Sequence, residues 1–220
     1  MPTIYADSGD GMIYSPTTDW EGARDATSGT VNSTNATEQE AITVFKFSGR
    51  GATTYRVYRS FFYFDTSAIT TTVSSATLKL RFLTTRAGSA NAIAIASTAF
   101  GGNGGTSLAD GDFNALDFGT PYTSEIDTSN TSTYTSITLN ATALSAMQNN
   151  DYLIFALINH AYDYNNEPPE DANTKVKVTF ANQTGTSTDP AIEYTAAAVT
   201  PPYVFFNKGK YKITSGKIKI

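Results

Sequence analysis

The sequence contains no cysteine and only one histidine, His160. Without cysteine, a disulfide framework, a thiolate zinc site and a cysteine nucleophile are all excluded. A catalytic triad or zinc site built on one histidine would need its partners close by, and the residues around His160 include acids but no nucleophile motif such as Gly-x-Ser-x-Gly. We therefore interpret His160 as a structural or loop residue and predict that the protein is not an enzyme.

Charged residues and long apolar runs are also scarce. Charged residues make up 16% of the chain, and no apolar run approaches the length that spans a bilayer. The first five residues lack the basic and apolar regions of a signal peptide, so we predict neither a signal peptide nor membrane insertion. The chain is instead rich in Thr, Ser, Asn, Gly and Ala, with 13 Tyr and 13 Phe. This composition is typical of β-sandwiches and viral fibres.

The charge is distributed unevenly along the chain. Residues 1–202 carry ten basic and twenty acidic side chains, whereas residues 203–220 carry five lysines and no acid. An acidic body argues against nucleic acid as a partner, since phosphate contacts need a basic face. The basic tail is expected to meet an acidic surface, on its own body, on a like subunit or on a different protein. The alternative is that its lysines only increase solubility.

Most of the chain shows the patterns of β-strands. Eight segments are rich in β-branched and aromatic residues and are separated by turn clusters: residues 41–47, 55–64, 76–83, 92–100, 134–139, 152–159, 174–180 and 191–194. One helix is expected after Asn140, a good N-cap, with its end near residues 149–151. We therefore predict an all-β, two-sheet jelly-roll-like sandwich of about eight strands with one short helix. Residues 15–39 and 101–132 are read as two long loops.

The C-terminal end reads as a separate appendage. Residues 1–195 would form the sandwich, residues 196–202 an Ala/Pro linker, and residues 203–220 a basic β tail. Within the tail, apolar and lysine residues alternate over 210–213 and 217–220, which predicts a hairpin with one apolar and one basic face. The residues expected to mediate assembly are Phe205, Phe206, Lys208, Lys210, Tyr211, Lys212, Ile213, Lys217, Ile218, Lys219 and Ile220.

Several stretches together resemble a known family. They are Arg59 to Ile69, Ser75 to Leu80, Leu139 to Leu144, Asp151 to Leu157 and Lys177 to Tyr194. As an ordered set they resemble the DNRLRE-type (disaggregatase-related) jelly-roll modules of bacterial and archaeal surface proteins, polysaccharide-degrading enzymes and phage virion proteins. The resemblance covers about residues 3–195, leaves the tail outside, and comes without an attached catalytic domain. It implies a jelly roll and, as in the enzyme-linked members, carbohydrate binding.

Acidic residues suggest two kinds of chemistry, each with a simpler interpretation. Asp7 and Asp10, in Asp-Ser-Gly-Asp-Gly, offer close oxygen ligands for a structural calcium ion, and Asp65 or Asp163 could join them; otherwise the segment is an ordinary turn. Asp110 with Asp112, and Asp163 with Glu167, are the nearest candidates for a glycosidase carboxylate pair.

The remaining candidates are an arginine and four aromatic residues. Arg59 and Asp65 lie six apart on one strand and so share a face, and we expect Arg59 to be paired with a carboxylate across the sheet. Aromatic rings in loops stack on sugars, which makes candidates of Trp20, Tyr122, Tyr162 and Tyr164. Alternatively, these rings close the ends of the sandwich.

Two functions are compatible with these observations. The first is a bacteriophage virion protein (a capsid decoration protein, head fibre or tail-associated adhesin) that uses its tail to dock onto other virion subunits or to assemble as a homo-oligomer. The second is a carbohydrate-binding module of a secreted or cell-surface bacterial protein or appendage. Both place the protein on a virion surface or outside the cell. Neither needs a cofactor beyond a structural calcium ion.

Overall fold

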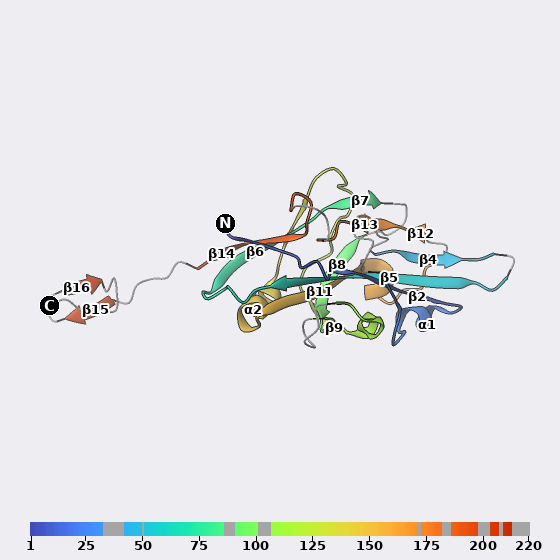
Figure 1. The fold of residues 1–220 in the computed structure, drawn as a ribbon, viewed down its shortest axis with the longest axis horizontal. Helices are drawn as coiled ribbons and strands as arrows, with labels where there is room; N and C mark the ends of the chain where they lie inside the picture. The colour runs from blue at the N-terminus through green and yellow to red at the C-terminus, as the bar shows by residue number, and fades with distance from the viewer. Residues whose placement is uncertain are drawn as a thin grey trace.

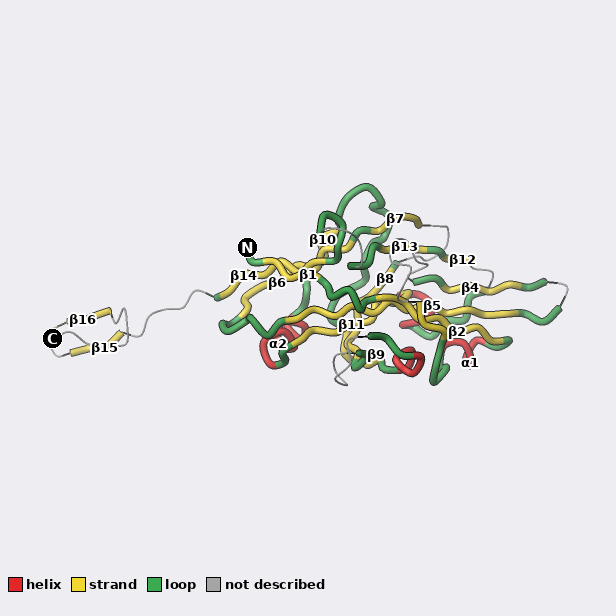
Figure 2. Tube along the Cα trace, in the orientation of Figure 1, coloured by secondary structure: helices red, strands yellow, loops and turns green. Residues whose placement is uncertain are grey.

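A computed structural model describes residues 1–32, 42–49, 51–85, 91–100, 107–170, 173–181, 186–197, 203–206 and 209–212. Two antiparallel sheets face each other and form a sandwich, and the short helices lie at its ends and over one face (Figures 1 and 2). In the described part of the chain, only α2 (Ala141–Asn149) is a helix of seven residues or more. The predicted all-β sandwich with one short helix is therefore confirmed.

The smaller sheet has four strands in the order β1-β14-β6-β10. Their bounds are Thr3–Tyr5 for β1, Ala191–Ala196 for β14, Val73–Leu80 for β6 and Thr135–Thr138 for β10. Along β6 and into β7, Leu78, Leu80 and Phe82 are fully buried, as their alternation with Lys79 and Arg81 predicts. The sheet therefore turns one apolar face toward the larger sheet.

The larger sheet has the order β12-β4-β5-β11-β8-β9, with β2 and β3 attached beside β5. Its strands are β2 (Gly11–Thr17), β3 (Thr30–Asn32), β4 (Val44–Phe47), β5 (Thr54–Asp65), β8 (Ala92–Ser97), β9 (Leu116–Pro121), β11 (Tyr152–Asn159) and β12 (Asn173–Thr174). Strands β7 (Phe82–Thr85) and β13 (Val176–Val178) form a short antiparallel pair. β7 follows β6 after one residue, and β13 follows β12 after one residue. This pair links the two sheets at one corner of the sandwich.

The larger sheet is buried on both faces, which its longest strand shows most clearly. In β5, Tyr58, Phe62 and Phe64 face the smaller sheet, and Phe62 stacks on Phe155 and Phe180 with ring centroids 5.2 and 5.3 Å apart. Val57 and Phe61, from alternate positions, belong to a second hydrophobic cluster on the opposite face. Residues 57–62 of this strand are buried on both faces, including the polar Arg59 and Ser60.

Short elements cover this second face, and they correct the prediction of two long structureless loops. Residues 15–39 include α1 (Trp20–Arg24) and β3, and residues 101–132 include the 3-10 helix η1 (Asp110–Asn114) and β9. A π-helical turn, η2 (His160–Tyr164), lies on the same side. These elements are too short to show a hydrophobic period, so the sequence pattern does not predict them.

The predicted helix is confirmed, with the predicted cap. The side-chain Oδ1 of Asn140 accepts a hydrogen bond from the Ala143 amide at 3.0 Å, and the helix ends at Asn149. Ala143 and Met147 are fully buried on one side of it. Within the described residues, no helix is long and apolar enough to cross a membrane.

The tail contains a strand pair, and the second half of the predicted hairpin, residues 217–220, lies outside the described residues. Strands β15 (Tyr203–Phe206) and β16 (Gly209–Lys212) are antiparallel, with Val204 opposite Tyr211. The pairing joins residues 203–206, which precede the predicted hairpin, to residues 209–212. It includes the backbones of Phe205, Phe206, Lys210, Tyr211 and Lys212. The other predicted tail residues lie outside the described residues, namely Lys208, Ile213, Lys217, Ile218, Lys219 and Ile220. Most of the linker, residues 198–202, also lies outside them.

Candidate functional site

A buried ion pair lies on the second face of the larger sheet. Arg59 of β5 and Asp163 of η2 are both fully buried. Arg59 Nε donates to Asp163 Oδ2 at 2.8 Å and Arg59 Nη2 donates to Asp163 Oδ1 at 2.7 Å. Two guanidinium nitrogens thus bind the two oxygens of one carboxylate, the bidentate geometry typical of arginine–carboxylate pairs. The expectation that Arg59 is paired rather than free is confirmed.

The rest of the guanidinium is satisfied by main-chain oxygens and by an aromatic ring. Arg59 Nη1 donates to the Phe113 carbonyl at 2.8 Å, and Nη2 donates to the Arg24 carbonyl at 2.7 Å. The Phe113 ring lies 4.1 Å from the guanidinium carbon, within the range of a cation–π contact. One side chain of β5 therefore fastens α1, η1 and η2 to the sheet.

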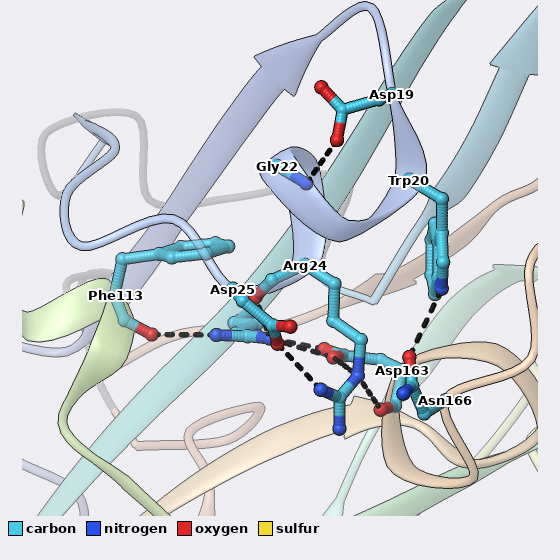
Figure 3. A network of polar contacts seen from close by, with 9 residues as sticks. Asp19, Trp20, Gly22, Arg24, Asp25, Phe113, Asp163 and Asn166 are labelled. Atoms are coloured by element: carbon cyan, nitrogen blue, oxygen red, sulfur yellow. Dashed lines mark hydrogen bonds and ion pairs between the residues drawn. The ribbon is translucent and has the colours of Figure 1, made fainter.

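A second arginine forms an outer layer over this pair. Arg24 Nε donates to the Asp163 carbonyl at 2.8 Å, and Arg24 Nη1 lies 2.6 Å from Asp25 Oδ1 (Figure 3). Its guanidinium carbon is 4.5 Å from the centre of the Phe118 ring. Phe118 lies in β9, whose register against β8 is irregular. Asp117 lies opposite Ala96, but Pro121 lies opposite the neighbouring Ile95, so residues 118–120 bulge out of the pairing.

The network holds the turn at residues 159–166 in place. Asn159 Oδ1 accepts from the Tyr162 amide at 2.8 Å, and the Asn165 amide donates to the His160 carbonyl, closing the π turn. Asn166 has φ of 56°, a left-handed conformation that asparagine tolerates better than most residues. Its Oδ1 accepts from Trp20 Nε1 at 3.2 Å, which ties the end of the turn to α1 (Figure 3).

A polar and aromatic group lies at the start of the same turn. The rings of His160 and Tyr164 stack at 5.6 Å between centroids, with 18° between their planes. His160 Nδ1 is 3.4 Å from Glu125 Oε1, which also accepts from Asn91 Nδ2 at 2.9 Å. The side chains of His160 and Glu125 are 23% and 49% exposed. An imidazole, a carboxylate and an amide beside a half-buried ring can hydrogen-bond the hydroxyls of a sugar.

The four aromatic candidates from the sequence separate into two pairs. Trp20 and Tyr122 are 8% and 7% exposed and pack in the second cluster and the central core, respectively. Their rings close the fold and leave little surface for a ligand, as the alternative interpretation of the sequence expects. Tyr162 and Tyr164 are half-buried against the second cluster, and only they keep partly exposed rings.

The proposed carboxylate pairs are engaged in structural hydrogen bonds. Asp112 is buried, and its Oδ2 accepts from the amides of Ala109 and Phe100, while Asp110 accepts from Gly111. Asp163 belongs to the ion pair with Arg59. Glu167 is exposed.

The calcium candidates Asp7 and Asp10 differ sharply in environment. Asp7 is exposed and caps its own turn by accepting from the Gly9 amide at 2.8 Å. Asp10 is fully buried, and burial, with smaller contributions from Asp189 and Asp7, raises the pKa of its carboxyl to about 8. Neither proposed additional ligand joins them: Asp65 accepts from Ser67, and Asp163 pairs with Arg59.

Sequence reasoning missed Asn91, Glu125 and Asp189. Asn91 and Glu125 come from loops on either side of β8 and β9 and meet only because an isolated bridge pairs Ala92 with Ile126. No spacing in the sequence signals that contact. Asp189 stands before a proline in a turn cluster, where an acid is unremarkable until its burial is known.

Comparison with known proteins adds no relative. No protein-family model matches the chain, and no curated protein matches it in sequence. The similarity to DNRLRE-type modules therefore stays a prediction, and the class that the structure defines is an antiparallel β-sandwich with a two-stranded C-terminal appendage.

Proposed function

We propose that this chain is a non-catalytic surface protein of a bacteriophage virion: a capsid decoration protein, a head fibre or a tail-associated adhesin. In this proposal the sandwich faces outward and the C-terminal tail docks onto a like subunit or another virion protein. The observation that carries the proposal is the contrast between the tail and the body. A strand pair in a segment with five lysines and no acid follows a sandwich segment that carries ten basic and twenty acidic residues.

Physical chemistry favours a docking role for this tail. An isolated two-stranded hairpin is marginally stable in water, so β15 and β16 gain stability when a further surface covers them. Adding such a strand pair to an exposed sheet edge uses main-chain hydrogen bonds for affinity. Opposite charge on the tail and the body would guide the encounter and make it sensitive to salt.

The test compares the full chain with residues 1–202 by light scattering after gel filtration. We expect the full chain to form an oligomer, or to incorporate into virion particles, and the truncated chain to stay monomeric and folded. A matched pair of variants separates the tail from charge in general: Lys208, Lys210 and Lys212 to Glu in the tail, against Lys46, Lys175 and Lys177 to Glu in the body. Truncated protein that still assembles or incorporates would refute tail docking.

The second candidate function is carbohydrate binding by a module of a secreted or cell-surface bacterial protein. The observation that favours it is the group formed by His160, Tyr164, Glu125 and Asn91. Its hydrogen-bonding atoms lie beside a partly exposed ring, and the ion pair of Arg59 and Asp163 beneath it holds the turn rigid. Preorganisation of this kind lowers the entropic cost of binding.

This candidate is tested with the same polysaccharide panel on three proteins. Tyr164→Ala should weaken binding by about 1–3 kcal/mol if the ring stacks on sugar. Tyr5→Ala is the matched control, because Tyr5 is 44% exposed on β1 of the smaller sheet. Equal binding by the wild type and both variants, or no binding to any polysaccharide, would remove this function.

A further inference from the structure

Three segments that are distant in sequence meet around the buried carboxyl of Asp10. Asp10 directly precedes β2, and its Oδ2 and Oδ1 both accept from the Ala181 amide, at 2.9 and 3.2 Å. The Ala6 amide donates to the Pro190 carbonyl at 2.9 Å. Residues 6–10, 179–181 and 188–190 are therefore fastened together at this point.

The second carboxyl in this region belongs to Asp189. Asp189 is 5% exposed, and its Oδ1 is buried and has no hydrogen-bond partner among the described residues. The carbonyls of Thr188 and Asp189 accept one hydrogen bond each, from Thr179 Oγ1 and the Tyr134 hydroxyl, at 2.7 and 2.8 Å. A buried carboxylate oxygen with no partner is costly, so a group that can bind it is expected.

No cationic side chain neutralises this pair of carboxyls. In the described part of the chain, neither Asp10 nor Asp189 forms an ion pair. Arg81 is close enough to influence Tyr134, and its Nε is also buried without a hydrogen-bond partner, but the ion pairs among the described residues include none between Arg81 and Asp189. The other charged group near Asp10 is Asp7, which adds negative charge.

We propose that Asp10 and Asp189 bind one calcium ion, which joins the N-terminal segment to the segments before and after residues 182–185. Calcium takes oxygen ligands from carboxylates, main-chain carbonyls and water in flexible geometry. Among the described residues, no group of three or more His, Cys, Asp or Glu side chains could hold a metal. The ion would accordingly have two carboxylate ligands, with main-chain oxygens and water completing its shell.

A site with only two acidic ligands should bind weakly. We expect a dissociation constant of about 10⁻⁴–10⁻³ M, the range of extracellular calcium modules. At that affinity, 10 mM CaCl₂ should raise the melting temperature of the full chain by about 3–10 °C over the value in EDTA. MgCl₂ at the same ionic strength should give little of this shift, because magnesium gives up its water reluctantly.

The test measures thermal unfolding of the wild type, Asp10→Asn, Asp189→Asn and the control Asp65→Asn, each in EDTA, CaCl₂ and MgCl₂ at pH 8. Asp65 is a suitable control because it is exposed and accepts only from Ser67. We expect the calcium shift in the wild type and in Asp65→Asn, and its loss in the other two variants. Calorimetric titration of the wild type with CaCl₂ should give one site per chain, which does not depend on how the variants fold.

Three results would overturn the calcium site. The first is no calcium-specific shift in the wild type, with no heat of binding. The second is a shift that Asp10→Asn and Asp189→Asn retain, which would place the ion elsewhere. The third is a melting temperature of the wild type that does not change with calcium, together with a higher melting temperature of Asp10→Asn than of the wild type in EDTA. A proton, and not a metal ion, would then neutralise the pair of carboxyls. None of these outcomes bears on tail docking, which is measured by mass and not by melting temperature.

Discussion

Replacing Asp163 by Asn should destabilise the protein strongly while leaving its shape almost unchanged. Asn keeps the size of the side chain but removes the charge, so the guanidinium of Arg59 stays fully buried without a counter-charge. Removing one partner of a buried ion pair typically costs about 3–5 kcal/mol. The two short hydrogen bonds from Arg59, at 2.7 and 2.8 Å, place this pair toward the upper part of that range.

The loss would be large relative to the whole stability of a domain. Typical domains have free energies of unfolding of about 5–15 kcal/mol. For a chain of this size, a loss of 3–5 kcal/mol lowers the melting temperature by about 6–20 °C. Chemical denaturation with urea, followed by fluorescence and circular dichroism, measures the free energy directly.

Two further variants make this prediction specific. Asp25→Asn removes the exposed partner of Arg24 and should change the free energy of unfolding by no more than about 1 kcal/mol. The double variant Arg59→Met with Asp163→Leu removes both charges and should recover most of the loss, because no buried charge stays unpaired. The reasoning fails if Asp163→Asn unfolds within 1 kcal/mol of the wild type, or if the double variant is no more stable than the single one.

Three other expectations follow from individual residues. In EDTA, the raised pKa of Asp10, about 8, means that the folded state holds a proton between about pH 4 and pH 8 that the unfolded state has lost. The free energy of unfolding should therefore fall by up to about 5 kcal/mol as the pH rises from 4 to 8. Asp10→Asn should flatten this pH profile, and an unchanged profile would contradict it. Asn140→Ala should cost about 1–2 kcal/mol in urea, because the cap on Ala143 and the bond to the Pro121 carbonyl are lost together. Gly29→Ala should cost about 1–3 kcal/mol, since a Cβ there would lie 2.6 Å from Ile13 Cγ2 and close to a main-chain oxygen, and a melting temperature equal to that of the wild type would exclude this clash.

The parts of the fold that the sequence predicts are those with long, regular patterns. The segment 55–64, rich in aromatic residues, becomes β5, and the apolar segment 152–159 becomes β11, its neighbour in the sheet. Asn140 followed by a helix-forming stretch is a local signal, and the structure confirms it. In each case one segment carries enough information to define its own conformation.

The candidate site could be predicted only in part, because its members meet through tertiary contacts. The burial of Arg59 in an apolar strand implies a partner, but nothing near it in sequence identifies Asp163, which lies 104 residues away. The same applies to Glu125 and His160, which come from separate loops. For Trp20 the sequence leaves open whether the ring binds a ligand or closes the sandwich, and the short helix α1 turns it into the second cluster.

Asp163 on one side, and Asp10 with Asp189 on the other, are buried carboxyls in different environments. Asp163 is neutralised by Arg59 from within the chain, so its site is complete and serves to hold the turn at residues 159–166. Asp10 and Asp189 form no ion pair among the described residues, and in our proposal a calcium ion from solution neutralises them. Side chains in a fully paired hydrogen-bond network keep their geometry, whereas a carboxyl oxygen that lacks a partner can bind a group from solution. Ligand binding at His160 and Tyr164 and cation binding at Asp10 should therefore be separable by mutation.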